Sequence, residues 1–145
     1  MNDVERMLAE HACQRLVYSY ANFIDAYDYK NFMTLWAEDA EWDLFGTISR
    51  GTQAIKETLE HRVPAQLLRH LVTNVVVDIT SPNTAIGSCY TVAFRGEGPR
   101  NTLPALITQP RWLVDYRDTF VKHPERGWLF SRREVISIME AKKPT

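Results

Sequence analysis

Cysteine and glycine are scarce in this chain of 145 residues, which contains two cysteines and six glycines. Cys13 and Cys89 stand in apolar contexts without CxxC spacing, which is typical of reduced thiols in a cytoplasmic protein. The glycines form no P-loop and no dinucleotide-binding fingerprint, and no cluster of residues has metal-ligand spacing. We therefore expect a cytoplasmic protein with no metal site and no cofactor.

An excess of charge of one sign and a long apolar run are also lacking. The formal net charge is −1, so we expect neither a nucleic-acid surface nor a polybasic membrane anchor. No segment approaches the roughly 20 apolar residues of a membrane span, and the start, MNDVERMLAEH, has no signal-peptide core. With 45% apolar and 24% charged residues, the composition and length predict one globular domain over residues 1–145.

Apolar periodicity divides the chain into a helical first part and a strand-rich second part. A helical repeat runs from Asp3 to about Ala26, and DYKNFMTLWA and GTQAIKETLEHR predict two shorter helices. Short strands are predicted at EWDLFG and TISR, and longer strands at residues 67–79, 83–95, 103–120 and 127–139. Pro104 and Pro110 predict a bulge or an edge position in the third long run. This order favours an α+β fold with helices on one face of a curved antiparallel sheet, and a ligand pocket between them.

Two polar residues interrupt an apolar strand, QLLRHLVTNVVVDI, at His70 and Asn74. Strand alternation predicts that both side chains lie on the same face of this strand. A buried polar side chain needs a partner, because an unpaired one costs roughly 1–3 kcal/mol. His70 is therefore either a hydrogen-bonded core residue or part of a cavity in which chemistry takes place.

Asp25 is a second residue whose position needs a reason. A carboxylate near the C-terminus of a helix opposes the macrodipole, at a cost of some 0.3–1 kcal/mol. Asp25 is either an exposed or loop-bonded carboxylate, or a functional group. If it meets His70, it can orient the imidazole as a general base suited to neutral pH.

Three stretches together resemble the SnoaL-like family of the nuclear transport factor 2-like superfamily. They are YSYANFIDAYDYKNFMTLWAEDAEWDLFG, RHLVTN and YRDTFVKHPERGWLFSRREV, and the resemblance extends from about residue 5 to residue 139. The first contains the D-x-x-D-aromatic pattern of the family as Asp25, Asp28 and Tyr29. The resemblance implies a cone-shaped fold, in which a strongly curved antiparallel sheet wraps around the long N-terminal helix and encloses an apolar pocket.

The family includes scytalone dehydratase, bile acid 7α-dehydratase and hexachlorocyclohexane dehydrochlorinase, which are cofactor-free lyases of small hydrophobic rings. Their shared pair, an Asp from the long helix and a His from the first long strand, matches Asp25 and His70. The resemblance thus implies that these two residues are catalytic. Ile24 and Leu44 stand where scytalone dehydratase has tyrosines, and Arg95 lies near the position of its second histidine, so its carbonyl-activating residues are missing.

Further residues are expected to contact the substrate. Asn74, on the predicted face of His70, is a candidate hydrogen-bond donor to the substrate or to a developing anion. Arg117 corresponds loosely to a cationic group of the dehydrochlorinase. Five aromatic residues are candidates for the walls of the pocket: Tyr18, Trp36, Trp42, Phe94 and Trp112. For each of them, packing in the core is the alternative role.

Taken together, these features predict a cofactor-independent lyase or isomerase, of dehydratase or dehydrohalogenase type, acting on a small hydrophobic cyclic compound. One alternative is a non-catalytic assembly subunit like the small subunits of ring-hydroxylating dioxygenases, with the pocket plugged by Trp42, Trp112 or Phe94. Another is a small-molecule binding protein in which Asp25 and His70 need not touch. A homo-oligomer, dimer or trimer, is expected because long exposed sheets are usually covered by a partner.

Overall fold

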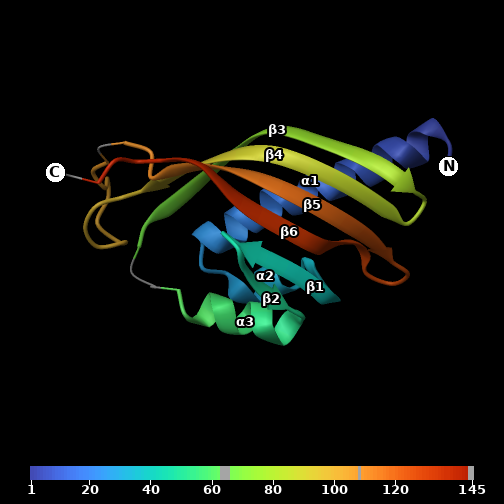
Figure 1. Cartoon of the computed structure of the whole chain (residues 1–145), viewed down its shortest axis with the longest axis horizontal. Coiled ribbons are helices and arrows are strands. Elements are labelled where there is room, and N and C mark those ends of the chain that lie inside the picture. Colours follow the sequence, from blue (N-terminus) through green and yellow to red (C-terminus); the bar gives the residue numbers. More distant parts are fainter. Residues whose placement is uncertain (63–65, 108, 144–145) are drawn as a thin grey trace.

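A computed structural model describes residues 1–62, 66–107 and 109–143 of the chain (Figure 1). The helices are α1 (Asp3–Asp25), α2 (Tyr29–Met33) and α3 (Thr52–Glu60). The strands are β1 (Trp36–Leu44), β2 (Thr47–Arg50), β3 (Leu68–Ser81), β4 (Thr84–Arg95), β5 (Trp112–His123) and β6 (Gly127–Glu140). Helix α1 runs along one face of the curved sheet, and α2 and α3 lie beside β1 and β2 at one margin (Figure 1).

Helix α1 presents a continuous buried stripe to the sheet. Its first turn is closed by a capping box, in which Asn2 and Glu5 each bind the backbone N–H of the other. Four residues of the stripe, Cys13, Val17, Tyr20 and Ile24, recur at spacings of three and four, so they lie on one face of the helix. Asp25 ends the helix on this buried side.

The sheet has the strand order β2-β1-β6-β5-β4-β3 and is not closed into a barrel. Each neighbouring pair is antiparallel except β1 and β6, which are parallel. The α+β fold with a long helix on a curved sheet is confirmed, but the sheet is mixed rather than wholly antiparallel. The reason is topological: the chain crosses after α3 to the far edge at β3, and three hairpins bring β6 back beside β1.

Strand β5 begins at Trp112, although apolar residues predicted a strand from residue 103. The first part of that prediction is wrong. Pro104 and Pro110 cannot donate a backbone hydrogen bond to a ladder, and among the described residues between β4 and β5 the only pairing is an isolated bridge between Glu97 and Leu106. Residue 108 of the predicted run lies outside the described residues.

The aromatic part of the core lies where α1 and α2 meet β1, β5 and β6. Tyr20 of α1 is at the centre of an aromatic cluster, with ring centroids 5.0–6.3 Å from those of its neighbours. These neighbours are Phe32, Trp36, Trp42, Tyr116 and Phe130. Edge-to-face and tilted ring contacts of this kind fix the end of α1 that carries Asp25.

Candidate functional site

A bulge in β3 sets which of its side chains face α1. The pairing register with β4 shifts between Thr73 and Val76, and Asn74 between them has a φ of 55°. Asn tolerates this left-handed conformation better than most residues, which explains an amide in an apolar strand. The more buried positions are Leu68, His70 and Val72 before the bulge and Val75, Val77 and Ile79 after it.

The predicted shared face of His70 and Asn74 is therefore wrong. The extra residue of the bulge reverses the alternation after Val72, so the side chain of Asn74 is exposed. Its Oδ1 accepts a hydrogen bond from the Thr73 hydroxyl at 2.9 Å.

The Asp25 carboxylate binds both the backbone and the ring of His70. The backbone N–H of His70 donates to Oδ2 at 2.8 Å, and ring Nδ1 lies 2.5 Å from Oδ1. An ionised carboxylate only accepts hydrogen bonds, so this partner assigns the hydrogen to Nδ1 and leaves a lone pair on Nε2 of the neutral ring. The two side chains are 10% and 11% exposed, so the pair is shielded but not sealed.

The position of β3 explains why Asp25 can reach this backbone. Strand β3 is at the edge of the sheet and pairs only with β4, so every second N–H points away from the ladder. Asp25 accepts the N–H of His70 from this unpaired side. Two hydrogen bonds thus compensate for a carboxylate placed against the helix macrodipole.

His70 lines a cavity of about 260 Å³ between α1 and the sheet. The described lining residues are Tyr20, Ile24, Trp42, Leu44, Phe45, Arg62, Gln66, Leu68, His70, Arg95, Trp112, Val114, Tyr116 and Val135. Aliphatic and aromatic groups predominate, and Trp42 and Trp112 lie in the walls and leave the cavity open. Asp25 lies behind His70 and faces a separate polar cleft with Asn22, Arg69 and Arg100.

Four other residues predicted to contact the substrate lie away from this cavity. Tyr18 is exposed and lines a small cleft with His11 on another face of α1. Trp36 is fully buried in the aromatic cluster, and Phe94 lines a surface groove near Ile107. Arg117 is exposed, because it alternates along β5 with the buried Tyr116 and Asp118.

Two tyrosines of the cavity were not singled out from the sequence: Tyr20 lies within the helical repeat, and Tyr116 begins the third stretch that resembles the family. Tyr20 accepts a hydrogen bond from Trp42 Nε1 at 3.1 Å, and Tyr116 packs against it. Burial raises the pKa of Tyr20 to about 12 and raises that of Tyr116 well above its ordinary value. Both therefore keep their hydroxyl hydrogens at neutral pH and can donate hydrogen bonds into the cavity.

Behind these tyrosines lies a buried ion pair that the sequence did not reveal. Arg133 Nε and Nη2 donate to the two Asp118 oxygens, each at 2.7 Å. Its guanidinium carbon lies 4.1–4.5 Å from the ring centroids of Tyr20, Tyr116 and Phe130. Burial alone would lower the pKa of Arg133, but Asp118 raises it above its ordinary value, so the guanidinium stays charged.

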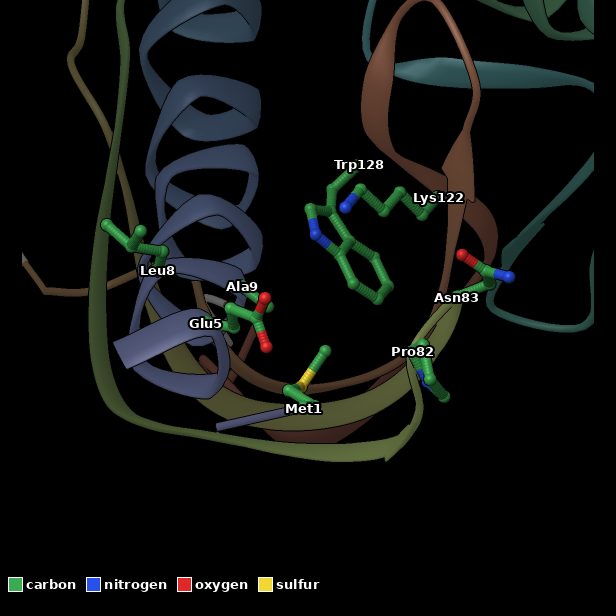
Figure 2. Close-up of a pocket in the computed structure, with 8 residues that line it drawn as sticks. All are labelled: Met1, Glu5, Leu8, Ala9, Pro82, Asn83, Lys122 and Trp128. Carbon is green, nitrogen blue, oxygen red and sulfur yellow. The ribbon is translucent and has the colours of Figure 1, made fainter. Parts of the chain in front are cut away.

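A second cavity, of about 550 Å³, lies at the other end of α1 (Figure 2). Figure 2 shows the Trp128 indole between α1 and the β5–β6 hairpin, with Lys122 beside it. Glu5 lines this cavity from α1, about 30 Å along the helix axis from Asp25 at 1.5 Å per residue. Its described lining contains no histidine or cysteine, so it offers no base or nucleophile comparable to His70.

The described residues contain neither a metal-binding cluster nor a helix that could span a membrane. No group of three or more His, Cys, Asp or Glu side chains in this part of the chain could hold a metal ion. Over the same residues, no helix has both the length and the apolar character needed to span a membrane.

A family model described as a SnoaL-like domain matches residues 5–134. No curated protein matches the chain.

Solved structures with similar folds include the following three. A provisionally named scytalone dehydratase from Novosphingobium aromaticivorans is 24% identical, with a TM-score of 0.76, over 93% of this chain and 87% of that one. A nuclear transport factor 2-like protein with a cystatin-like fold from the same organism is 22% identical, with a TM-score of 0.74, over 92% and 84%. A type 2 hexachlorocyclohexane dehydrochlorinase is 18% identical, with a TM-score of 0.79, over 97% and 92%. At these identities the likeness shows the fold alone.

Proposed function

The chain belongs to the SnoaL-like family, and on this premise we propose that it is a cofactor-independent lyase or isomerase acting on a small hydrophobic cyclic compound. The observation that carries the proposal is the contact between Asp25 and His70 at the margin of an apolar cavity. His70 is the general base and Asp25 is its positioning residue. The names of two structural neighbours, a dehydratase and a dehydrochlorinase, belong to the same class of reaction.

The proposed reaction begins with proton abstraction by Nε2 of His70. The proton comes from a ring carbon next to an electron-withdrawing group, and the electron pair of the C–H bond forms a C=C bond as the leaving group departs. A hydroxide leaving group takes the proton back from Nε2 and leaves as water, whereas a halide leaves as an anion and the proton passes to solvent. In an isomerase, the same proton returns to another ring carbon.

Asp25, two tyrosines and the apolar walls of the cavity contribute to the reaction rate together with the base. A base held in position contributes about 10²–10⁴-fold to the rate. Asp25 binds both the backbone N–H and ring Nδ1 of His70, which holds the imidazole in one orientation before the substrate binds. The hydroxyls of Tyr20 and Tyr116 are donors for a developing negative charge, and the apolar walls exclude water from it.

The two alternatives fit the cavity less well. An assembly subunit is expected to have this space plugged by Trp42, Trp112 or Phe94, yet about 260 Å³ stays open. A binding protein without turnover has no need of a carboxylate that holds a histidine ring at 2.5 Å. The lyase or isomerase function is therefore the one we favour.

We also propose that the protein is a homo-oligomer, either a dimer or a trimer. Leu71, Val76, Ile86 and Tyr90 are each between 48% and 58% exposed on the outward face of β3 and β4. Adjacent strands thus present a shared apolar patch, which a second copy of the chain can cover. Sedimentation velocity with and without Val76→Glu tests this proposal, and a monomeric wild-type protein contradicts it.

The catalytic proposal is tested with cyclic β-hydroxy and β-halo ketones, for example 3-hydroxycyclohexanone. Formation of the conjugated enone is followed by absorbance, and exchange of the ring α-protons in D₂O is followed by NMR. We expect His70→Gln to lower kcat/KM by about 10²–10⁴-fold, and Asp25→Asn to lower kcat more than it changes KM.

The matched controls are His11→Gln and Asp39→Asn, because both residues are exposed and lie outside the cavity lining. We expect both control variants to have wild-type kinetics. The proposal fails if neither elimination nor α-proton exchange occurs with this panel or with the same ketones carrying a carboxylate on the ring. It also fails if the reactions of the His70 variant match those of the wild type.

A further inference from the structure

The cavity that His70 lines has an unbalanced charge. Arg62 and Arg95 are among its described lining residues, and none of these residues is an Asp or a Glu. The Asp25 carboxylate is already bound to the backbone and ring of His70 and does not line the cavity. An apolar cavity with two cations at its margin is suited to a ligand that brings a negative charge.

Arg95 has the guanidinium with the most unused hydrogen-bonding capacity in this cavity. It ends β4 opposite Leu68 of β3, and its side chain is exposed. Within the described residues, its guanidinium makes no hydrogen bond and no ion pair. By contrast, Arg50, Arg132 and Arg133 each lie within 3.5 Å of a carboxylate.

Arg62 is held in place but is not neutralised. Its Nη1 donates weakly to the carbonyl of Ile24 at 3.3 Å and to the hydroxyl of Tyr29 at 3.4 Å. Its guanidinium carbon also lies 5.2 Å from the centroid of the Tyr27 ring. None of these partners carries a negative charge, so Arg62 adds to the positive potential beside Arg95.

We propose that the natural ligand of this cavity is an organic anion, namely an apolar ring that carries a carboxylate bound by Arg95. The inference rests on the proposed function only in assigning this cavity as the ligand site. A planar guanidinium offers two parallel N–H donors that match a carboxylate, which a neutral ring lacks. With the carboxylate at Arg95, the ring of the ligand lies among Trp42, Trp112 and His70.

In this arrangement Arg95 binds the ligand and His70 acts on its ring. The ion pair with Arg95 fixes one end of the ligand, and the apolar walls then limit how its ring can turn. Arg95 is thus a specificity-determining residue, and His70 acts on a ring that is already oriented. Neutral rings of the same size fit the walls but leave Arg95 without a partner.

The test compares trans-cinnamate with trans-cinnamamide, which have nearly the same shape and differ in charge. Each compound is titrated into the ¹⁵N-labelled protein, and the amide and indole signals are followed by NMR. Trp42 and His70 report on this cavity, and Trp128 reports on the cavity in Figure 2. We expect cinnamate to bind about tenfold or more tightly than the amide, as charge-assisted hydrogen bonds allow.

Three variants locate the anion. We expect Arg95→Gln to reduce the affinity for cinnamate to that for the amide, and to leave the affinity for the amide unchanged. Arg117→Gln removes an exposed arginine from the outward side of β5, and Lys122→Gln removes a cation from the second cavity. We expect both control variants to bind cinnamate as the wild type does.

Three outcomes overturn the proposal. They are equal binding of both compounds, no binding of cinnamate, and loss of cinnamate binding in Lys122→Gln rather than in Arg95→Gln. Because the measurement is binding and not turnover, it separates this inference from the proposed reaction. A protein that binds cinnamate through Arg95 but catalyses no elimination or exchange disproves the reaction and leaves the ligand class intact.

Discussion

Asp25–His70 and Asp118–Arg133 are both pairs of an acidic and a basic side chain that join two elements of the fold, and they differ in what lies beyond the second partner. Asp118 and Arg133 are 1% and 0% exposed, and aromatic rings cover the guanidinium. Asp25 and His70 are slightly more exposed, and the imidazole borders an open cavity. Tyr20 contacts both regions, because it packs on Arg133 and lines the cavity together with His70.

This difference separates a structural pair from a candidate catalytic pair. The bidentate contact uses two nitrogens of Arg133, and rings cover the third, so no small molecule can reach the charge. His70 uses only Nδ1 for its partner and keeps Nε2 for another molecule. Burial of an ion pair is thus a poor indicator of a functional site. A reactive atom that has no protein partner and borders a cavity is a better indicator.

The largest effect is expected when Asp118 is replaced. Asp118→Asn leaves the charge of Arg133 in the core without a carboxylate, and breaking a buried pair in this way costs about 3–5 kcal/mol. Urea unfolding followed by tryptophan fluorescence measures the loss. The control is Glu41→Gln, which breaks part-exposed contacts with Arg50 and Arg132 and is expected to cost less than about 1 kcal/mol. Equal losses in the two variants would show that the Asp118 pair does not hold the core together.

A smaller loss of stability is expected for Asp25→Asn. The amide loses a charge-assisted hydrogen bond worth about 1.5–3 kcal/mol, but the variant also removes a carboxylate that opposes the macrodipole by about 0.3–1 kcal/mol. The net cost is therefore about 0.5–2.7 kcal/mol, measured by the same unfolding experiment. A loss as large as that of Asp118→Asn would mean that Asp25 is mainly structural.

The smallest effect concerns the two buried thiols. Burial, reinforced for Cys13 by nearby Asp118, raises the pKa of Cys13 from 9.0 to about 12, and burial raises the pKa of Cys89 from 9.0 to about 11. The unfolded chain therefore releases these protons at a lower pH than the folded chain does. Their contribution to stability is complete below about pH 9 and is lost as the pH rises toward 11 and 12.

This pH dependence is measured by urea unfolding at several values from about pH 8 to pH 10.5. Cys89→Ala removes one of the two groups, so its unfolding free energy should fall less steeply with pH than that of the wild type. Both thiols should also resist a disulfide reagent in the native protein at pH 8. Rapid labelling without unfolding would contradict the burial of these groups.

Local patterns predicted most of the elements, because a helical stripe and strand alternation are properties of neighbouring residues. The parallel contact of β1 with β6 was missed, since it depends on where the chain returns after three hairpins. The exposure of Asn74 was missed because alternation assumes a regular ladder. An Asn within an apolar run was the available signal of a bulge.

The candidate site was predicted only in part. The sequence singled out Asp25 and His70 because each was out of place in its element. Arg95 and Arg62 gave no such signal, since charged residues near the ends of elements are usual. Arg133 could not be found by counting either: a regular β5–β6 hairpin that turns before Gly127 pairs Asp118 with Arg132, and a register shift between Phe120 and Thr119 makes Arg133 the partner instead.

The bulge at Asn74 makes β3 a strand of two independent halves. The first half sets which way His70 faces, and the second half sets which residues join the core. Without the extra residue, both halves would share one alternation, and one of them would face the wrong way. A protein designer could therefore redesign residues 68–72 to carry a different base or to line a different pocket, and leave the rest of the β3–β4 hairpin unchanged.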